Sequence, residues 1–194
     1  MLQIIFLFIF TYLVSAIPFG LIVSNYKGVN LRKIGSGNIG ATNVYRALGF
    51  KWAALVFALD AFKGALPLCM TILLFPQYYL LHVFIAITAI LGHTLSVFAQ
   101  FKGGKGAATG LGVLLILSPP IFLITALIAF IIIFLSRTIS IGTISCCVLL
   151  PFLFYFFKYP PIYIFFVGLV CLYVIYRHQA NVKRIIEGTE SKIF

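Results

Sequence analysis

The chain is short of acidic residues and of charge altogether. Only three of its 194 residues are Asp or Glu, and charged residues make up 9% of the sequence. Soluble domains carry about 25% charged residues, so this composition excludes an ordinary soluble domain. The 63% content of hydrophobic residues instead predicts an all-α integral membrane protein, with residues 1–194 forming a single domain.

The scarcity of acids also argues against a metal site. Asp60 is far in sequence from Glu187 and Glu190, so no carboxylate cluster is expected to hold Mg²⁺. The four cysteines lie in apolar runs without the spacing of a zinc site and are expected to be small buried residues. No Ser-His-Asp arrangement is evident. We therefore expect no metal and no cofactor.

Seven apolar runs follow one another along the chain: Ile4–Val23, Trp52–Phe75, Tyr78–Phe98, Ala107–Leu117, Pro119–Leu135, Ile141–Phe157 and Pro160–Tyr176. A membrane span needs about 20 residues, with a range of about 17–25, and six of the runs reach it. The fourth run would rise only about 16 Å as a helix. The first run lacks the basic start of a signal peptide and is expected to be a retained helix.

The fourth and fifth runs are predicted to be separate helices. Two successive prolines, Pro119 and Pro120, remove two backbone donors, and Ser118 before them avoids the helical region. With seven transmembrane helices, twelve of the fourteen Lys and Arg residues fall on one side. The positive-inside rule then places the N-terminus outside and the C-terminus in the cytoplasm. The net charge of +11 is thereby explained by topology and an anionic cytoplasmic partner, without nucleic acid.

The first polar segment, "GSGNIGATNVYR" at residues 35–46, interrupts the apolar sequence. Glycines let the backbone turn tightly and approach an anion. Four side chains add polar donors: Ser36, Asn38, Thr42 and Asn43. Arg46 offers a planar fork suited to phosphate. The alternative is a solvated loop, and no Rossmann context surrounds the glycines.

The second segment, "GHTLSVFAQFKGGKGAATG" at residues 92–110, leads into the short fourth run. Lys102 and Lys105 on a glycine loop at a helix N-terminus predict an anion site, although the spacing is not that of a Walker A loop. The alternative is a cytoplasmic loop with snorkelling lysines. His93 and Ser96 share a helix face, as structural hydrogen-bonding groups or as part of the site.

The third segment, "RHQANVKRIIEGTE" at residues 177–190, places His178 and Asn181 on one helix face. Its cations also fit an amphipathic helix on anionic lipid headgroups. A short basic turn, "SRTIS" at residues 136–140, falls on the same predicted side. The charges of Asp60 and Lys63 lie within the second run, where they are costly. Their i, i+3 spacing predicts a structural pair bordering the site.

A phosphate site without metal must neutralise charge with Arg, Lys and N–H groups. The chemistry of such a site should need little activation, so one substrate should arrive already activated. The three segments, in this order, resemble the bacterial acyl-phosphate:glycerol-3-phosphate acyltransferases over essentially the whole chain. The resemblance implies a seven-helix plasma-membrane (inner-membrane) enzyme with a cytoplasmic site. It would move a fatty acyl group from acyl phosphate to the sn-1 hydroxyl of glycerol 3-phosphate, the first step of phospholipid synthesis. Functional coupling to the enzyme that makes acyl phosphate is a further implication.

The family's motif positions carry over to the following residues: Ser36, Asn38, Thr42, Asn43, Arg46, His93, Ser96, Lys102, Gly103, Gly104, Lys105, Gly106, Arg177, His178, Asn181, Gly188 and Glu190. We expect the backbone amides of "KGGKG" and Lys105 to hold acyl phosphate, with Ser36 and Asn38 completing the cradle. The phosphate of glycerol 3-phosphate is expected on five residues: Arg46, Arg137, Ser140, His178 and Asn181.

The base that deprotonates the attacking hydroxyl is either His178 or a phosphate oxygen of the donor. Two other classes of protein fit the same basic face. A transporter or anion channel would also carry intramembrane charge and a short helix, but no inverted repeat is visible. A scaffold subunit could use the basic face to dock on anionic lipid.

Overall fold

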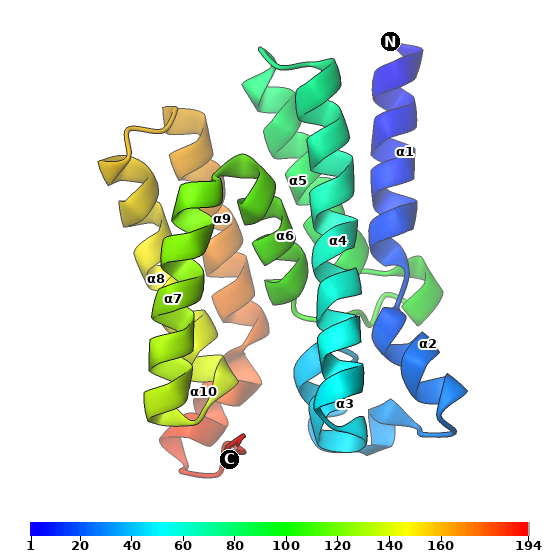
Figure 1. Ribbon diagram of the computed structural model, residues 1–194. Coiled ribbons are helices and arrows are strands. Elements are labelled where there is room, and N and C mark those ends of the chain that lie inside the picture. Colours follow the sequence, from blue (N-terminus) through cyan, green and yellow to red (C-terminus); the bar gives the residue numbers. More distant parts are fainter. Residues whose placement is uncertain (194) are drawn as a thin grey trace. The chain divides into compact units, whose positions relative to one another are not determined.

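The computed structural model describes residues 1–193, and each regular element within them is helical (Figure 1). The chain forms two compact units, of which unit 1 ends at Leu117 and unit 2 begins at Ser118. Unit 1 contains α1 Leu2–Ala16, α2 Phe19–Tyr26, η1 Leu31–Lys33, α3 Ala41–Leu48, α4 Phe50–Leu74, α5 Tyr79–Thr94, η2 Val97–Ala99 and α6 Ala107–Leu117. Unit 2 contains α7 Pro119–Ser136, α8 Ile139–Phe156, α9 Pro161–Arg177 and α10 Gln179–Ile186.

The all-helical membrane architecture predicted from composition is confirmed. Within residues 1–193, five stretches are long and apolar enough to cross a membrane: Leu2–Tyr26, Phe50–Leu74, Tyr79–Ala99, Pro119–Ser136 and Ile139–Phe156. A sixth is reached if α9 and α10, which meet at a bend of 58°, count as one span. Helix α6 has the 11 residues expected of the short fourth run. Seven crossings and the orientation of the termini stay predictions.

The break at Ser118 is confirmed. Helix α6 ends at Leu117 and α7 begins at Pro119. Both prolines lie in the first turn of α7, where a missing N–H costs little. The Ser118 hydroxyl accepts a hydrogen bond from the amide of Ile121 at 3.3 Å and so caps the helix.

A second break, between α1 and α2, was not expected, because the first apolar run reads as one uninterrupted segment. Pro18 has no N–H to donate and keeps Ile17 out of the helical region, so the helix stops at Ala16 and restarts at Phe19. The carbonyl of Ile17, which the break releases, accepts a hydrogen bond from the Lys63 ammonium at 2.8 Å. An intramembrane lysine thus satisfies a backbone group that proline leaves without its helical partner.

Small residues let the helices of unit 1 approach closely, as is usual in membrane proteins. A Cβ on Gly112 of α6 would lie 1.9 Å from the carbonyl oxygen of Ala61 in α4, and a Cβ on Gly64 would lie 2.3 Å from that of Thr109. A Cβ on Gly92 of α5 would lie 2.9 Å from the carbonyl oxygen of Tyr12 in α1. The backbones of α4 and α6, and of α1 and α5, are therefore in contact.

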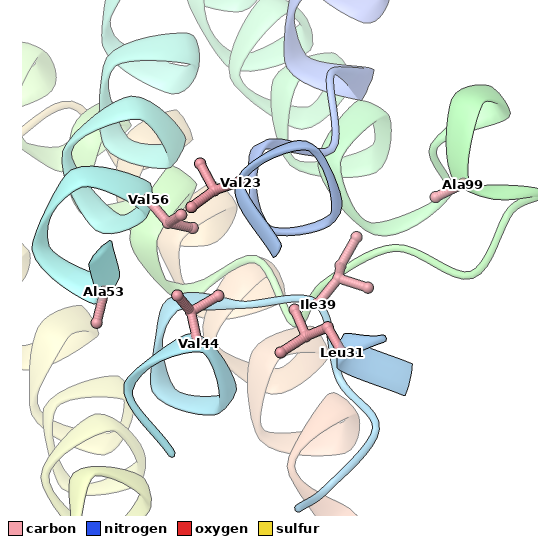
Figure 2. Packing of buried hydrophobic residues seen from close by; sticks show 7 residues of the cluster. All are labelled: Val23, Leu31, Ile39, Val44, Ala53, Val56 and Ala99. Carbon is pink, nitrogen blue, oxygen red and sulfur yellow. The ribbon is translucent and has the colours of Figure 1, made fainter. Parts of the chain in front are cut away.

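A buried apolar cluster anchors the segment between α2 and α4 (Figure 2). Its members are Val23, Leu31, Ile39, Val44, Ala53, Val56 and Ala99. Figure 2 shows that three of them, Leu31, Ile39 and Val44, come from the polar first segment and its flanks. The segment therefore has a core of its own, which fixes it at the end of unit 1 opposite the N-terminus (Figure 1). Three of the four cysteines, Cys146, Cys147 and Cys171, are buried as expected.

Candidate active site

The first polar segment turns at its glycines, as predicted. Gly35 and Gly37 adopt φ values of 55° and 66°, which side-chain-bearing residues rarely adopt. The second half of the segment is helical, because Ala41–Leu48 form helix α3. Val44 on that helix is fully buried in the apolar cluster, and this packing stabilises a helix that the glycine-rich composition concealed.

Asn43 shapes this segment from within. Its amide Nδ2 donates to the carbonyl oxygens of Leu31 at 3.1 Å and Ile34 at 3.0 Å, and its Oδ1 accepts from the amide of Ser36 at 3.1 Å. The side chain is 1% exposed. Both hydrogens of Nδ2 are thereby used on backbone carbonyl groups, so Asn43, which we expected among the substrate-binding residues, has a structural role here.

The remaining residues of this segment are more accessible. Ser36 is exposed, and Asn38, Thr42 and Arg46 are half-buried. Asn38 accepts from the amide of Gly40 at 2.9 Å, just before α3 begins. A Cβ on Gly35 would lie 3.2 Å from Cδ of Arg46, so the glycine lets the turn lie close against the arginine stem. Asn38 and Thr42 thus lie at the start of α3, and Arg46 lies in its last turn.

The glycine loop between α5 and α6 folds onto the end of α5. The amide of Gly103 donates to the carbonyl oxygen of Thr94 at 3.0 Å, and the amide of Gly104 donates to that of His93 at 3.2 Å. These bonds satisfy carbonyl groups in the last turn of α5. The amides of Gly103 and Gly104, which we expected to cradle an anion, are used in this structure to seat the loop.

Glycine is required at both positions by close approach. A Cβ on Gly103 would lie 2.0 Å from the carbonyl oxygen of His93, and a Cβ on Gly104 would lie 2.1 Å from Nε2 of the same residue. Lys102 is exposed and Lys105 is half-buried. Gly106 follows at a φ of 89° and its carbonyl oxygen accepts the amide of Gly110 at 2.7 Å, within the first turn of α6. Lys105 thus stands directly before the N-terminus of α6.

Two further side chains tie this loop to the rest of unit 1. Ser96 is 1% exposed, donates to the carbonyl oxygen of Ala16 and accepts from the amide of Ala99 at 3.2 Å. The structural alternative for Ser96 therefore holds. Arg32 donates through Nη2 to the carbonyl oxygens of Lys102 at 2.9 Å and Ala99 at 3.3 Å. Sequence reasoning counted Arg32 only as a cation of the basic face, and no local pattern distinguishes it from its neighbours.

The pairing predicted for Asp60 and Lys63 is confirmed. Their side chains lie 2.8 Å apart and are each 3% exposed. Nδ1 of His93 lies 3.7 Å from Oδ1 of Asp60 on the neighbouring helix. The carbonyl oxygen of Asp60 also accepts from the Thr109 hydroxyl of α6 at 2.9 Å. Asp60 therefore contacts both helices between which the glycine loop runs.

In unit 2, a polar network joins the start of α8, helix α10 and the segment that follows it. Oε1 of Glu190 accepts from Ser140 at 2.8 Å and from Asn181 at 2.6 Å, and Oε2 accepts from Nε of Arg184 at 2.6 Å. Asn181 also donates to the Ser140 hydroxyl at 2.7 Å. Ser140 and Asn181, which we expected on a substrate phosphate, are therefore bound to a carboxylate of the chain itself.

Burial alone would raise the pKa of Glu190, but its hydrogen bonds from Asn181, Ser140 and Arg184 together with the Arg184 charge hold that pKa below the ordinary value. Glu190 is thus ionised at neutral pH and joins α8 to α10. Gly188 permits the turn between α10 and Glu190 with a φ of 69°.

The other predicted residues of unit 2 lie close to this network in sequence. His178, at the junction of α9 and α10, is 5% exposed, and its Nδ1 lies 2.7 Å from the carbonyl oxygen of Val174. A carbonyl can only accept, so Nδ1 carries a hydrogen, and Nε2 is the proton-accepting atom of the neutral ring. Arg177 is half-buried at the end of α9. Arg137 is exposed, and its carbonyl oxygen accepts the amide of Ile193 at 2.9 Å.

Within residues 1–193, no three side chains of His, Cys, Asp or Glu gather as a metal site would require. The constellation that could act chemically consists of cations and hydroxyls. In unit 1 it is Ser36, Arg46, Lys102 and Lys105 around two glycine-shaped turns. In unit 2 it is His178 with the adjacent Arg177, together with the exposed Arg137. Such groups neutralise phosphate and position an oxygen nucleophile.

Comparisons with known proteins agree over nearly the whole chain. The family described as "Glycerol-3-phosphate acyltransferase" matches residues 5–188. The glycerol-3-phosphate acyltransferase of Aquifex aeolicus (strain VF5) is 41% identical over 189 residues, covering 97% of this chain and 98% of that protein. The protein of the same name from Bacillus subtilis (strain 168) is 41% identical over 189 residues, covering 96% of each.

Two solved structures share the fold. The glycerol 3-phosphate form of PlsY (YgiH), an integral membrane glycerol 3-phosphate acyltransferase, is 38% identical with a TM-score of 0.95, covering 98% of this chain and 95% of that one. The lysophosphatidic acid form is 37% identical with a TM-score of 0.91 and the same coverage.

Proposed function

Because the chain belongs to the glycerol-3-phosphate acyltransferase family, we propose that it transfers a fatty acyl group from acyl phosphate to the sn-1 hydroxyl of glycerol 3-phosphate. The products are lysophosphatidic acid and inorganic phosphate. Glycerol 3-phosphate acylation by a membrane enzyme belongs to phospholipid synthesis. The similar solved structures, described as glycerol 3-phosphate and lysophosphatidic acid forms, support the acceptor and the product.

The observation that carries the choice of donor is the position of Lys105. It follows a glycine loop seated on α5 and directly precedes α6, so its charge adds to the positive end of the helix dipole. Acyl phosphate is a mixed anhydride whose leaving group is already a stable anion. A fixed cation there needs only to stabilise the charge that develops on the carbonyl oxygen and the departing phosphate.

The reaction joins the sn-1 oxygen of the acceptor to the acyl carbon and breaks the bond between that carbon and the phosphate oxygen. We assign Lys105, with Ser36 and Asn38, to the acyl phosphate, and Arg46 to a substrate phosphate as its planar fork suggests. The hydroxyl proton passes either to Nε2 of His178 or to a phosphate oxygen of the donor. Ser140 and Asn181 act indirectly in this proposal, by fixing α8 to α10 through Glu190.

The proposal includes location. The apolar helices make this a multi-span membrane protein, and we propose the bacterial plasma membrane with the site facing the cytoplasm. A donor as reactive toward water as acyl phosphate is best used where it is made. Functional coupling to the enzyme that produces it is therefore part of the proposal.

The test uses purified protein in detergent, supplied with acyl phosphate and glycerol 3-phosphate. Phosphate and lysophosphatidic acid should appear in equal amounts. A parallel reaction with an acyl thioester should give no product; product from the thioester alone would overturn the donor assignment. If no product forms with either donor, an anion transporter is favoured. Uptake of labelled glycerol 3-phosphate into vesicles that contain the protein would then reveal it.

Two variants separate the proposed roles. Lys105→Ala should lose kcat/KM for acyl phosphate, and near-normal activity would refute the role of Lys105. His178→Ala should lower kcat by about 10²–10⁴ if His178 is the base. If it instead raises the KM for glycerol 3-phosphate with kcat nearly intact, His178 binds the acceptor and the donor phosphate takes the proton.

A further inference from the structure

Unit 1 buries a charged cluster beneath the glycine loop. Asp60 and Lys63 are each 2% exposed and His93 is 4% exposed. The Lys63 ammonium lies 2.8 Å from Asp60 and donates at 2.8 Å to the carbonyl oxygen of Ile17. The structure thus accounts for the buried Lys63, because its ammonium group binds the carbonyl released between α1 and α2 and neutralises Asp60.

Lys63 alone does not explain the placement of Asp60. The oxygen that faces Lys63, Oδ1, also lies 3.7 Å from Nδ1 of His93 in α5. The backbone carbonyl of Asp60 accepts the hydroxyl of Thr109 in α6 at 2.9 Å. His93 and Thr109 stand on the two helices that the glycine loop connects, so one residue contacts both supports of that loop.

The ring of His93 in turn supports the loop directly. A Cβ on Gly104 would lie only 2.1 Å from Nε2 of the His93 ring, so the ring lies directly against this glycine. The carbonyl oxygen of His93 also accepts the Gly104 amide at 3.2 Å. At 3.7 Å the Asp60 carboxylate lies beyond hydrogen-bond distance of Nδ1, so its effect on the ring is electrostatic. Its negative charge favours a hydrogen on Nδ1 and a ring orientation that keeps this nitrogen toward Asp60. The orientation of the ring then decides how deeply Gly104 lies, and with it the next residue, Lys105.

We propose that Asp60 is a positioning residue for acyl transfer, acting through the His93 ring and Gly104 on Lys105. This inference rests on the proposed function. It assigns to the buried acid a role beyond an ion pair within the membrane. A displacement of Lys105 by about 1 Å would be expected to lower the rate about 10²-fold, so a residue that does not touch the substrate would control catalysis.

The experiment compares five variants in detergent: Asp60→Asn, His93→Gln, the double Asp60→Asn/His93→Gln, the double Asp60→Asn/Lys63→Met, and His82→Gln. His82 is a matched control, since it is a 2% exposed histidine of the same helix whose Nε2 lies 2.8 Å from the Phe75 carbonyl oxygen. Four quantities are measured: kcat and KM for acyl phosphate, the thermal midpoint, and amide hydrogen exchange of residues 95–106.

Asp60→Asn and His93→Gln should each lower kcat/KM by about tenfold to 10²-fold. Because both act through the same ring, the double variant should have a kcat/KM no lower than that of the less active single variant. Exchange of the loop amides should rise about tenfold in both, as the bonds that seat the loop open. Asp60→Asn/Lys63→Met removes both buried charges but also the donor to the Ile17 carbonyl oxygen. It should recover part of the thermal midpoint that Asp60→Asn loses, but not kcat/KM. His82→Gln should change the thermal midpoint only.

If kcat/KM follows the thermal midpoint in all five variants, and loop exchange stays at the wild-type rate in Asp60→Asn, Asp60 is only a structural partner of Lys63 and the inference is overturned. Failure of the proposed function has a different signature, because the wild-type protein would then release no phosphate from acyl phosphate. The exchange measurement needs no turnover and would still show in that case whether Asp60 holds the glycine loop against α5.

Discussion

Replacing Gly103 with alanine tests whether the glycine loop depends on close backbone contact. The new Cβ would lie 2.0 Å from the carbonyl oxygen of His93 and 2.7 Å from that of Thr94. Ordinary contact begins at 3.4 Å, so one backbone must move by about 1.4 Å. Both obstructing atoms belong to the last turn of α5 and cannot rotate away as a side chain could. The loop must therefore lift, and the Gly103 and Gly104 hydrogen bonds must lengthen.

Overpacking of this kind costs about 1–3 kcal/mol of folding free energy, which a folded membrane protein can tolerate. Misplacement of a catalytic group by about 1 Å costs about 10²-fold in rate. Gly103→Ala should therefore lower kcat/KM for acyl phosphate by about 10²-fold in protein that still unfolds cooperatively on heating. Activity is followed by phosphate release, and stability by thermal unfolding in the same detergent.

The matched control is Gly168→Ala. Gly168 lies inside α9, and a Cβ there meets no atom within 4 Å. This substitution should stabilise the helix by about 0.5–1 kcal/mol and leave kcat/KM unchanged. The reasoning is refuted if Gly103→Ala retains activity within a few-fold of wild type, since the loop would then not need its seat on α5 to present Lys105.

Three other variants test the supports of the site. Asn43→Ala removes three buried hydrogen bonds. The free energy of unfolding should fall by about 1–3 kcal/mol for each group left unsatisfied, and activity should fall with the thermal midpoint. Gly112→Ala places a Cβ 1.9 Å from the carbonyl oxygen of Ala61, forces α4 and α6 apart and should lower the thermal midpoint. Burial raises the pKa of Glu190 but its hydrogen bonds lower it more, so its stabilisation is present above the ordinary value of 4.5 and is lost as the pH falls through the lower folded pKa. Glu190→Gln should remove this part of the dependence of the thermal midpoint on pH.

The helices could be predicted from the sequence because a bilayer leaves the backbone few choices. Apolar runs of sufficient length had to be helical, and the prolines after Ser118 had to divide the fourth run from the fifth. The break at Ile17 was missed because a single proline in an apolar run can also sit in a continuous, kinked helix. What decides between the two is a partner for the released carbonyl, and that partner, Lys63, comes from a distant part of the chain.

The turns and loops of the candidate site could be predicted from the sequence, and the hydrogen-bond partners of their polar groups could not. The glycine turns at Gly35 and Gly37 and the loop before α6 lie where the motifs indicated. The directions of their donors could not be predicted. Asn43, Ser96 and the Gly103 amide bind the chain's own carbonyl groups. A sequence shows that donors are present, but whether each one is used by a ligand or by neighbouring backbone depends on the tertiary structure.

There is a physical reason why several donors of the glycine loop bind carbonyl groups of the chain itself. A cation stabilises a developing negative charge most effectively when it is already oriented, because little reorganisation is then needed during the reaction. Lysine has a long, flexible side chain, so Lys105 can be oriented only if its backbone is rigid. The inward bonds of Gly103, Gly104 and Arg32 supply that rigidity. In the proposed mechanism, the donors that bind the chain's own carbonyl groups are therefore what holds Lys105, which stands before a helix N-terminus, in position for a phosphate.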